Sequence, residues 1–203
     1  MTKIAIDIVL LPNQEMISRA VEISKRQSAE YNNEKIVLDE KVCLPHISLA
    51  MGVIEEDNIP KANIVIKEIA SSFQALELKA DHYQGNRIPS GDIVSEFTVA
   101  NTPKLQSLHE VTMRKLKALL THDASLEMVF SPPSAEEITL YWIRNYAKKS
   151  SFENFKPHIT LGFGELKDIQ TSINFTASTI AICHLGNYCT CQKILFSAKL
   201  KQS

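Results

Sequence analysis

The chain has 203 residues, of which 44% are hydrophobic and 22% are charged, and its formal net charge is −1. These values are ordinary for a folded globular protein and allow one sizeable core. A net charge of −1 lacks the positive excess that proteins binding long nucleic acids usually carry, so no binding of long duplexes is expected. A site for a small anion needs only a few local donors and is compatible with this composition.

The longest apolar stretch, residues 4–11, is too short to span a bilayer and contains Asp7. No basic run precedes it and no small-residue cleavage site follows it, which argues against a signal peptide. The four cysteines contain no Cys-x-x-Cys pair, and a chain of this size does not depend on a disulfide framework. We therefore expect a cytoplasmic monomer without membrane contact.

The first half of the chain alternates between strand and helix signals. Isoleucines at every second position predict the first strand, which ends at Pro12. Asn58 is a plausible helix cap, and Pro60 fits the first turn of the helix that follows. In chain order, the predicted elements are a strand over 4–11, a helix over 14–31, a strand over 46–53, a helix over 58–72 and strands over 75–83 and 92–100.

The second half begins again with a helix. Thr102 is a predicted cap with Pro103 in the first turn, and Ser134 with Glu137 resembles a capping box that opens another helix. A turn at residues 186–187 predicts a closing hairpin. The predicted elements are a helix from 103 to about 119, a helix over 134–149 and strands over 157–163, 174–185 and 188–200.

This order of elements gives each half a helix followed by a strand that carries a histidine. Strands with short connections and interleaved helices are typical of an α+β protein with mainly antiparallel sheets flanked by helices. The sequence therefore predicts a single domain made of two lobes around a central cleft. The lobes span approximately residues 1–91 and 92–203, with strands exchanged between them.

One five-residue pattern occurs twice, each time at the start of a predicted strand. The two copies read Pro45-His46-Ile47-Ser48-Leu49 and Pro157-His158-Ile159-Thr160-Leu161. Side chains alternate along a strand, so each histidine shares a face with the hydroxyl residue two positions later. If the two strands face each other, two imidazoles and two hydroxyls converge on one pocket.

Hydrolysis of a phosphodiester can use this set of groups. A neutral histidine takes a proton from the attacking water, and a protonated histidine gives one to the leaving oxygen. The hydroxyls of Ser48 and Thr160 donate hydrogen bonds to the non-bridging phosphate oxygens. We assign His46 as the acid and His158 as the base, although the residues favour the reverse assignment almost equally. The scheme requires no metal and no cofactor.

The paired segments resemble the two signature motifs of the two-histidine phosphoesterase superfamily. That group includes proteins called 2′-5′ RNA ligases, RNA 2′,3′-cyclic phosphodiesterases and plant cyclic phosphodiesterases. The resemblance implies a bilobal, pseudo-symmetric fold with the motifs facing across a central cleft. By motif position, it implies a catalytic set of His46, Ser48, His158 and Thr160.

The resemblance also implies action on 2′,3′-cyclic phosphates or 2′-5′ linked nucleotides, with a nucleotide or RNA end as the partner. The element order agrees over nearly the whole chain, but outside the motifs no residues align. Segment 50–52, which follows the first motif, departs from the familiar pattern more than segment 162–164 does. A binding module without turnover and a 2′-5′ RNA ligase are the alternative functions.

Three further residues are candidates for substrate binding. Tyr83 and Arg87 lie near a Gly/Asn/Pro loop, for which a solvated hairpin loop is the favoured interpretation. The alternative is that this loop rims the cleft, where Tyr83 would stack on a base and Arg87 would pair with phosphate. Trp142 could form a base platform, although its helical spacing with neighbouring aromatics favours core packing. Three lysines approach the second motif and are expected mainly as ordinary solvated side chains, namely Lys148, Lys149 and Lys156.

Four residues near the end of the chain suggest a zinc site, but their spacing does not match common zinc sites. They are Cys183, His184, Cys189 and Cys191. Buried cysteines in a strand pair are the favoured interpretation. Two other histidines, His109 and His122, have charged neighbours and are expected at the surface.

Overall fold

The computed structural model describes residues 2–88, 90–130 and 135–202. The strands are β1 (Lys3–Pro12), β2 (Ile47–Glu55), β3 (Leu76–Arg87), β4 (Ile93–Val99), β5 (His158–Phe163), β6 (Ile173–Leu185) and β7 (Cys191–Lys199). The α-helices of the described residues are α1 (Gln14–Tyr31), α2 (Ile59–Ala70), α3 (Pro103–Leu116) and α4 (Glu137–Lys149). None of these helices is long and apolar enough to cross a membrane.

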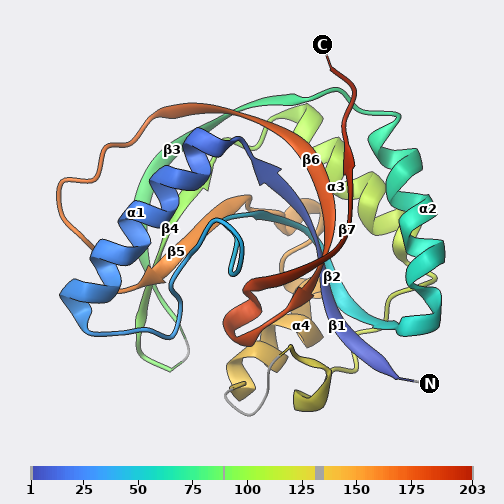
Figure 1. Ribbon diagram of the computed structural model, residues 1–203, viewed down its shortest axis with the longest axis horizontal. Helices are drawn as coiled ribbons and strands as arrows, with labels where there is room; N and C mark the ends of the chain where they lie inside the picture. The colour runs from blue at the N-terminus through green and yellow to red at the C-terminus, as the bar shows by residue number, and fades with distance from the viewer. Residues whose placement is uncertain (1, 89, 131–134, 203) are drawn as a thin grey trace.

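All seven strands join one open, antiparallel sheet in the order β2-β1-β6-β3-β4-β5, with β7 also paired to β6. The long strand β6 connects the two parts of the sheet, because it pairs with β1 and β7 near one end and with β3 near the other. The sheet is curved, with β3, β4 and β5 on the left of Figure 1 and β1, β2 and β7 on the right. The strands that carry the two motifs, β2 and β5, stand at opposite ends of the strand order.

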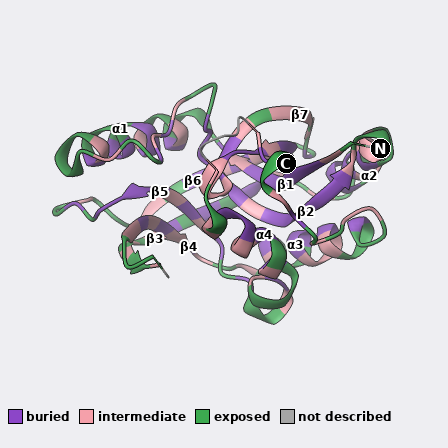
Figure 2. Ribbon diagram, turned by 90° about the horizontal axis from the view of Figure 1, so that it is seen from below, coloured by how far each residue is buried: buried purple, intermediate pink, exposed green. Residues whose placement is uncertain are grey.

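Helices cover the sheet on both of these parts. Helix α1 packs on β5, whereas α2 and α3 pack on each other and on the other part of the sheet (Figure 1). Figure 2 shows the strands β1 and β2 largely in the colour of buried residues and the outward side of α1 in the colour of exposed ones. The predicted α+β class, with antiparallel sheets flanked by helices, is confirmed.

Local signals explain where the helices begin. The side chain of Asn13 accepts a hydrogen bond from Met16 N, so Asn13 caps α1, which begins at Gln14. The predicted cap of α3 is confirmed, because Thr102 Oγ1 accepts from Leu105 N at 3.2 Å. Asn58 occupies the N-cap position of α2 but makes no side-chain capping bond. The predicted capping box at Ser134 lies outside the described residues, and α4 begins at Glu137.

The predicted closing hairpin is present, but its connection is longer than the predicted turn at residues 186–187. A turn of 3₁₀-helix over Asn187–Cys189 joins β6 to β7, so Leu185 pairs with Cys191 and His184 pairs with Lys193. Cys183 and Cys191 form a disulfide between the two strands, with Cα atoms 5.6 Å apart. The expectation that these cysteines are simply buried is therefore incomplete, because burial comes with a covalent bond across the hairpin.

The expectation that His109 lies at the surface is wrong. Its ring is fully buried on the inner face of α3 and stacks on Phe155 with the ring centroids 3.9 Å apart. Nδ1 lies 2.7 Å from the carbonyl oxygen of Leu49, and Nε2 lies 2.8 Å from the backbone nitrogen of Phe152. A carbonyl oxygen can only accept, so the proton is on Nδ1 and Nε2 accepts from Phe152. This neutral ring connects β2 to the segment that leads into β5.

Candidate active site

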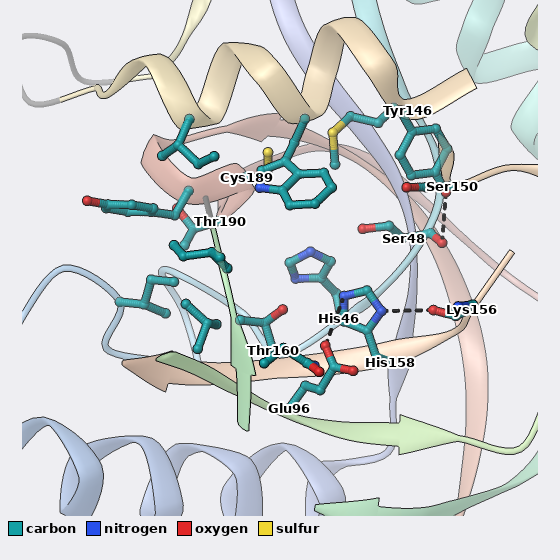
Figure 3. Close-up of a pocket in the computed structure, with 18 of the residues that line it drawn as sticks. His46, Ser48, Glu96, Tyr146, Ser150, Lys156, His158, Thr160, Cys189 and Thr190 are labelled. Atoms are coloured by element: carbon teal, nitrogen blue, oxygen red, sulfur yellow. Dashed lines mark hydrogen bonds and ion pairs between the residues drawn. The ribbon is translucent and has the colours of Figure 1, made fainter. Parts of the chain in front are cut away.

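A cavity of about 530 Å³ lies between the two parts of the sheet and helix α4. All four residues of the duplicated motifs line it: His46, Ser48, His158 and Thr160. Figure 3 shows the two imidazole rings next to each other in this pocket, with both hydroxyl side chains nearby. The structure thus brings together residues that stand 112 positions apart in the chain (158 − 46 = 112).

The first motif holds its histidine in a nearly closed environment. His46 Nδ1 lies 2.7 Å from the carbonyl oxygen of Leu44. Because a carbonyl oxygen can only accept, Nδ1 carries the proton and donates it, and in the neutral ring Nε2 has a free lone pair. The side chain is 12% exposed, and Nε2 lies 3.8 Å from Asp7 Oδ2. Burial lowers the pKa of His46 to about 4, and the nearby His158 acts in the same direction. His46 is therefore neutral at neutral pH.

The hydroxyl of the first motif contacts the same acidic residue. Ser48 Oγ lies 2.5 Å from Asp7 Oδ2, and the carbonyl oxygen of Ser48 accepts a hydrogen bond from Tyr146 Oη at 3.2 Å. Asp7 is 0% exposed, and its Oδ1 has no hydrogen-bond partner among the described residues. Burial raises the pKa of Asp7, while the hydrogen bond from Ser48 opposes that shift.

The second motif repeats this pattern in a more open place. His158 Nδ1–H donates to the carbonyl oxygen of Lys156 at 2.8 Å, and Nε2 lies 3.8 Å from Glu96 Oε2 (Figure 3). Glu96 on β4 is the strand partner of Thr160 on β5. The side chain of His158 is 42% exposed and that of Glu96 is 17% exposed. Each half of the site thus provides an imidazole, a hydroxyl and a carboxyl group, and the histidine and carboxyl group of the first half are the more deeply buried.

Two of the three predicted substrate-binding residues line the cavity, namely Arg87 and Trp142. Tyr83 does not, because β3 continues to Arg87 instead of ending at residue 83. Along this strand Gln84 and Asn86 face the cavity, so Tyr83 points to the other side. There its hydroxyl accepts a hydrogen bond from Leu166 N at 2.7 Å, and its ring packs edge-on against Phe97. Tyr83 therefore lies outside the cavity that holds the two motifs.

The lysines expected mainly as solvated side chains include two that line the cavity, Lys149 and Lys156. Together with Arg87 they add positive charge to the lining of the cavity. The rest of the lining is largely apolar and includes Trp142, which is half-buried, and Ile138 one turn earlier on α4. The cavity therefore combines a few charged groups with a largely apolar lining, as sites for small organic ligands do.

The sequence did not identify Asp7 and Glu96 as site residues. Asp7 had a signal, because it is an acidic residue inside an otherwise apolar strand. The isoleucines at 4, 6 and 8 face the core, so Asp7 on the opposite face points toward the cavity side of the sheet. Glu96 had no such signal, because polar residues are ordinary on the exposed face of a strand.

The suspected zinc residues do not form a metal site in the structure. Cys183 and Cys191 are bonded to each other, and His184 Nε2–H donates to the carbonyl oxygen of Met128 at 3.0 Å. In the part of the chain that the structure describes, no group of three or more histidine, cysteine or acidic side chains has the arrangement of a metal site.

No protein-family model and no curated protein matches this sequence. Solved structures do match. TT0787 of Thermus thermophilus is 15% identical, with a TM-score of 0.58 over 98% of this chain and 100% of that one. LigT of E. coli complexed with phosphate is 13% identical, with a TM-score of 0.55 and complete coverage of both chains.

LigT of E. coli complexed with 3′-AMP is 12% identical, with a TM-score of 0.53 over 97% of this chain and 98% of that one. A structure described as a phosphoesterase is 13% identical, with a TM-score of 0.53 over 98% and 99% of the two chains. At these identities the likeness concerns the fold. The chain therefore has, over essentially its whole length, the fold of LigT and of this phosphoesterase.

Proposed function

We propose that this protein is a phosphodiesterase that hydrolyses 2′,3′-cyclic phosphate or 2′-5′ phosphodiester bonds of nucleotides or RNA ends without a metal. The observation that carries the proposal is the orientation of the two histidines. Each Nδ1–H is bound to a carbonyl oxygen two residues earlier, which leaves each Nε2 on the cavity side for proton transfer. The LigT complexes with phosphate and 3′-AMP support a nucleotide-sized phosphate ligand.

The environments of the two rings favour a division of labour opposite to the one expected from the sequence. His46 is mostly buried, faces the cavity and is neutral, which suits a general base. His158 is more exposed, and Glu96 Oε2 lies 3.8 Å from its Nε2. We therefore infer that His46 takes a proton from the attacking water. As the bond between phosphorus and the leaving oxygen breaks, His158 gives that oxygen a proton.

Other cavity residues receive roles in the same proposal. The hydroxyls of Ser48 and Thr160 donate to the non-bridging phosphate oxygens, where the negative charge lies. Trp142 offers its ring to a base, and Arg87 binds phosphate. The division into two lobes, approximately residues 1–91 and 92–203 with strands exchanged between them, belongs to the same proposal. A cytoplasmic location and a monomeric state also belong to the proposal.

The function is tested by a metal-free assay with EDTA present. The substrates are 2′,3′-cyclic mononucleotides, 2′-5′ dinucleotides and RNA with a cyclic-phosphate end. We expect turnover of at least one class at a rate that EDTA does not change. Tight binding without product would contradict the proposal and favour a binding module, and joining of cyclic-phosphate RNA to a 5′-hydroxyl RNA would favour a ligase.

The acidic side of the pH profile tests the role of His46. A base must be deprotonated, so kcat/KM should fall on acidification only as His46 takes up its proton, with a midpoint near its pKa of about 4. The measurement is kcat/KM for the best substrate across the acidic range, with enzyme stability checked at each pH. A midpoint near the ordinary histidine value of about 6.5 would contradict the assignment of His46 as base.

A further inference from the structure

Asp7 is a buried acidic group in the site to which the mechanism above gives no role. It lies on β1 opposite Met51 of β2 and Cys183 of β6, and its side chain is 0% exposed. Oδ2 lies 2.5 Å from Ser48 Oγ, whereas Oδ1 is buried and has no hydrogen-bond partner among the described residues. Among the described residues, the Ser48 hydroxyl is thus the one hydrogen-bond partner of the Asp7 carboxyl group.

The charges around Asp7 do not compensate a carboxylate. The titratable groups that face it are His46 before β2, Tyr146 on α4 and Cys189 after β6. All three are neutral near pH 7, because burial lowers the pKa of His46 to about 4 and raises the pKa values of the other two groups. Cys183 is held in a disulfide, and within the described ranges no lysine or arginine forms an ion pair with Asp7. Burying a carboxylate without a cation beside it costs free energy, so the environment of Asp7 favours its protonated, neutral form.

The protonation state of Asp7 decides where the single hydrogen of the Ser48 hydroxyl points. If Asp7 is ionised, it must accept that hydrogen, and Ser48 Oγ then turns its lone pairs toward the phosphate. If Asp7 carries a proton, its own O–H donates to Ser48 Oγ. The Ser48 hydrogen is then free to point at a phosphate oxygen.

We propose that Asp7 is a positioning residue that works in its neutral form, donating to Ser48 Oγ and so directing the Ser48 hydroxyl onto a non-bridging phosphate oxygen. This inference rests on the proposed function and adds a third member to the first half of the site. If Ser48 donates its hydrogen to the substrate, the substrate must offer an anionic oxygen that accepts it. Glu96 beside His158 is partly exposed to water and does not share this role.

Two substitutions separate the neutral role from a charged one. Asn places an N–H donor where the acid O–H would be, so Asp7→Asn should keep kcat/KM within about tenfold at neutral pH, the range of one ordinary hydrogen bond. It should also hold its activity to higher pH than the wild type, because the amide does not ionise. Asp7→Leu removes the donor and should lower kcat by about 10²–10³-fold, as does loss of one donor to a reacting oxyanion.

The coupling with Ser48 distinguishes positioning from a general effect on the fold. Ser48→Ala should lower kcat strongly in the wild type and in Asp7→Asn but little in Asp7→Leu, where the hydroxyl is already misdirected. If Asp7→Asn loses as much activity as Asp7→Leu, a carboxylate is required and the proposal is overturned. Additive losses for Ser48→Ala and Asp7→Leu would overturn it as well.

An infrared measurement tests the charge state of Asp7 without reference to activity. Wild-type protein at neutral pH should show the carbonyl band of a protonated carboxylic acid, and that band should shift when the protein contains ¹³C-labelled aspartate. In Asp7→Asn the band should be absent. If the protein turns over no substrate, the proposed function fails, yet the band still decides whether Asp7 is neutral. The absence of a labelled acid band in the wild type would overturn the inference whatever the activity.

Discussion

Replacing either cavity histidine by alanine should lower kcat by about 10²–10⁴-fold, which is the usual contribution of one general acid or base. His46→Ala removes the group that accepts the proton of water, and His158→Ala removes the group that protonates the leaving oxygen. The measurement is steady-state turnover of the best substrate from the metal-free assay, with unfolding followed in parallel. We expect both variants to remain folded, because neither ring lies within the apolar core.

The matched control is His82→Ala, because His82 is an exposed histidine of β3 and is not among the residues that line the cavity. It should leave kcat unchanged. Turnover at the wild-type rate in His46→Ala or His158→Ala would show that the missing ring transfers no proton.

A substrate with a better leaving group separates the two roles. A p-nitrophenolate needs no proton as it departs, so a p-nitrophenyl phosphodiester should restore much of the activity of His158→Ala. It should restore little in His46→Ala, because water still needs a base. The opposite pattern of rescue would restore the assignment that the sequence suggested, with His46 as the acid.

The sequence was sufficient to find the two motifs because each is local. Strand periodicity alone places His46 with Ser48 and His158 with Thr160, and a pattern that occurs twice is far more specific than either copy. The carboxyl groups beside them come from other strands: Asp7 from β1 and Glu96 from β4. Which strands become neighbours depends on the whole sheet, so no local pattern could have associated these residues with the motifs.

The errors in the sequence predictions have equally physical causes. Tyr83 was assigned to the cleft because the strand was expected to end there. The strand instead continues for four more residues, to Arg87. Side chains alternate along it, so Gln84 faces the cavity and Tyr83 faces away from it. His109 was assigned to the surface because of its charged neighbours, although its spacing from Leu105 and Thr112 matches the buried side of a helix.

The second large effect is expected from His109→Leu, which should lower the free energy of unfolding by about 2–6 kcal/mol, or about 1–3 kcal/mol for each buried polar group left without a partner. Leucine fills most of the volume of the ring but can neither donate to the Leu49 carbonyl oxygen nor accept from Phe152 N. Urea denaturation monitored by fluorescence measures the change. His82→Leu, an exposed replacement of the same kind, should change the free energy of unfolding little.

The contribution of His109 should also depend on pH in a defined direction. Burial lowers the pKa of His109 in the folded protein, so the unfolded chain takes up a proton at a higher pH than the folded one. Stability from this residue is therefore fully present above the ordinary histidine pKa of about 6.5 and is lost as the pH falls below it. The destabilisation of His109→Leu relative to wild type should shrink on acidification, because wild type alone carries this penalty. A difference that stays constant or grows as the pH falls would show that the buried ring is not held neutral between β2 and the segment before His158.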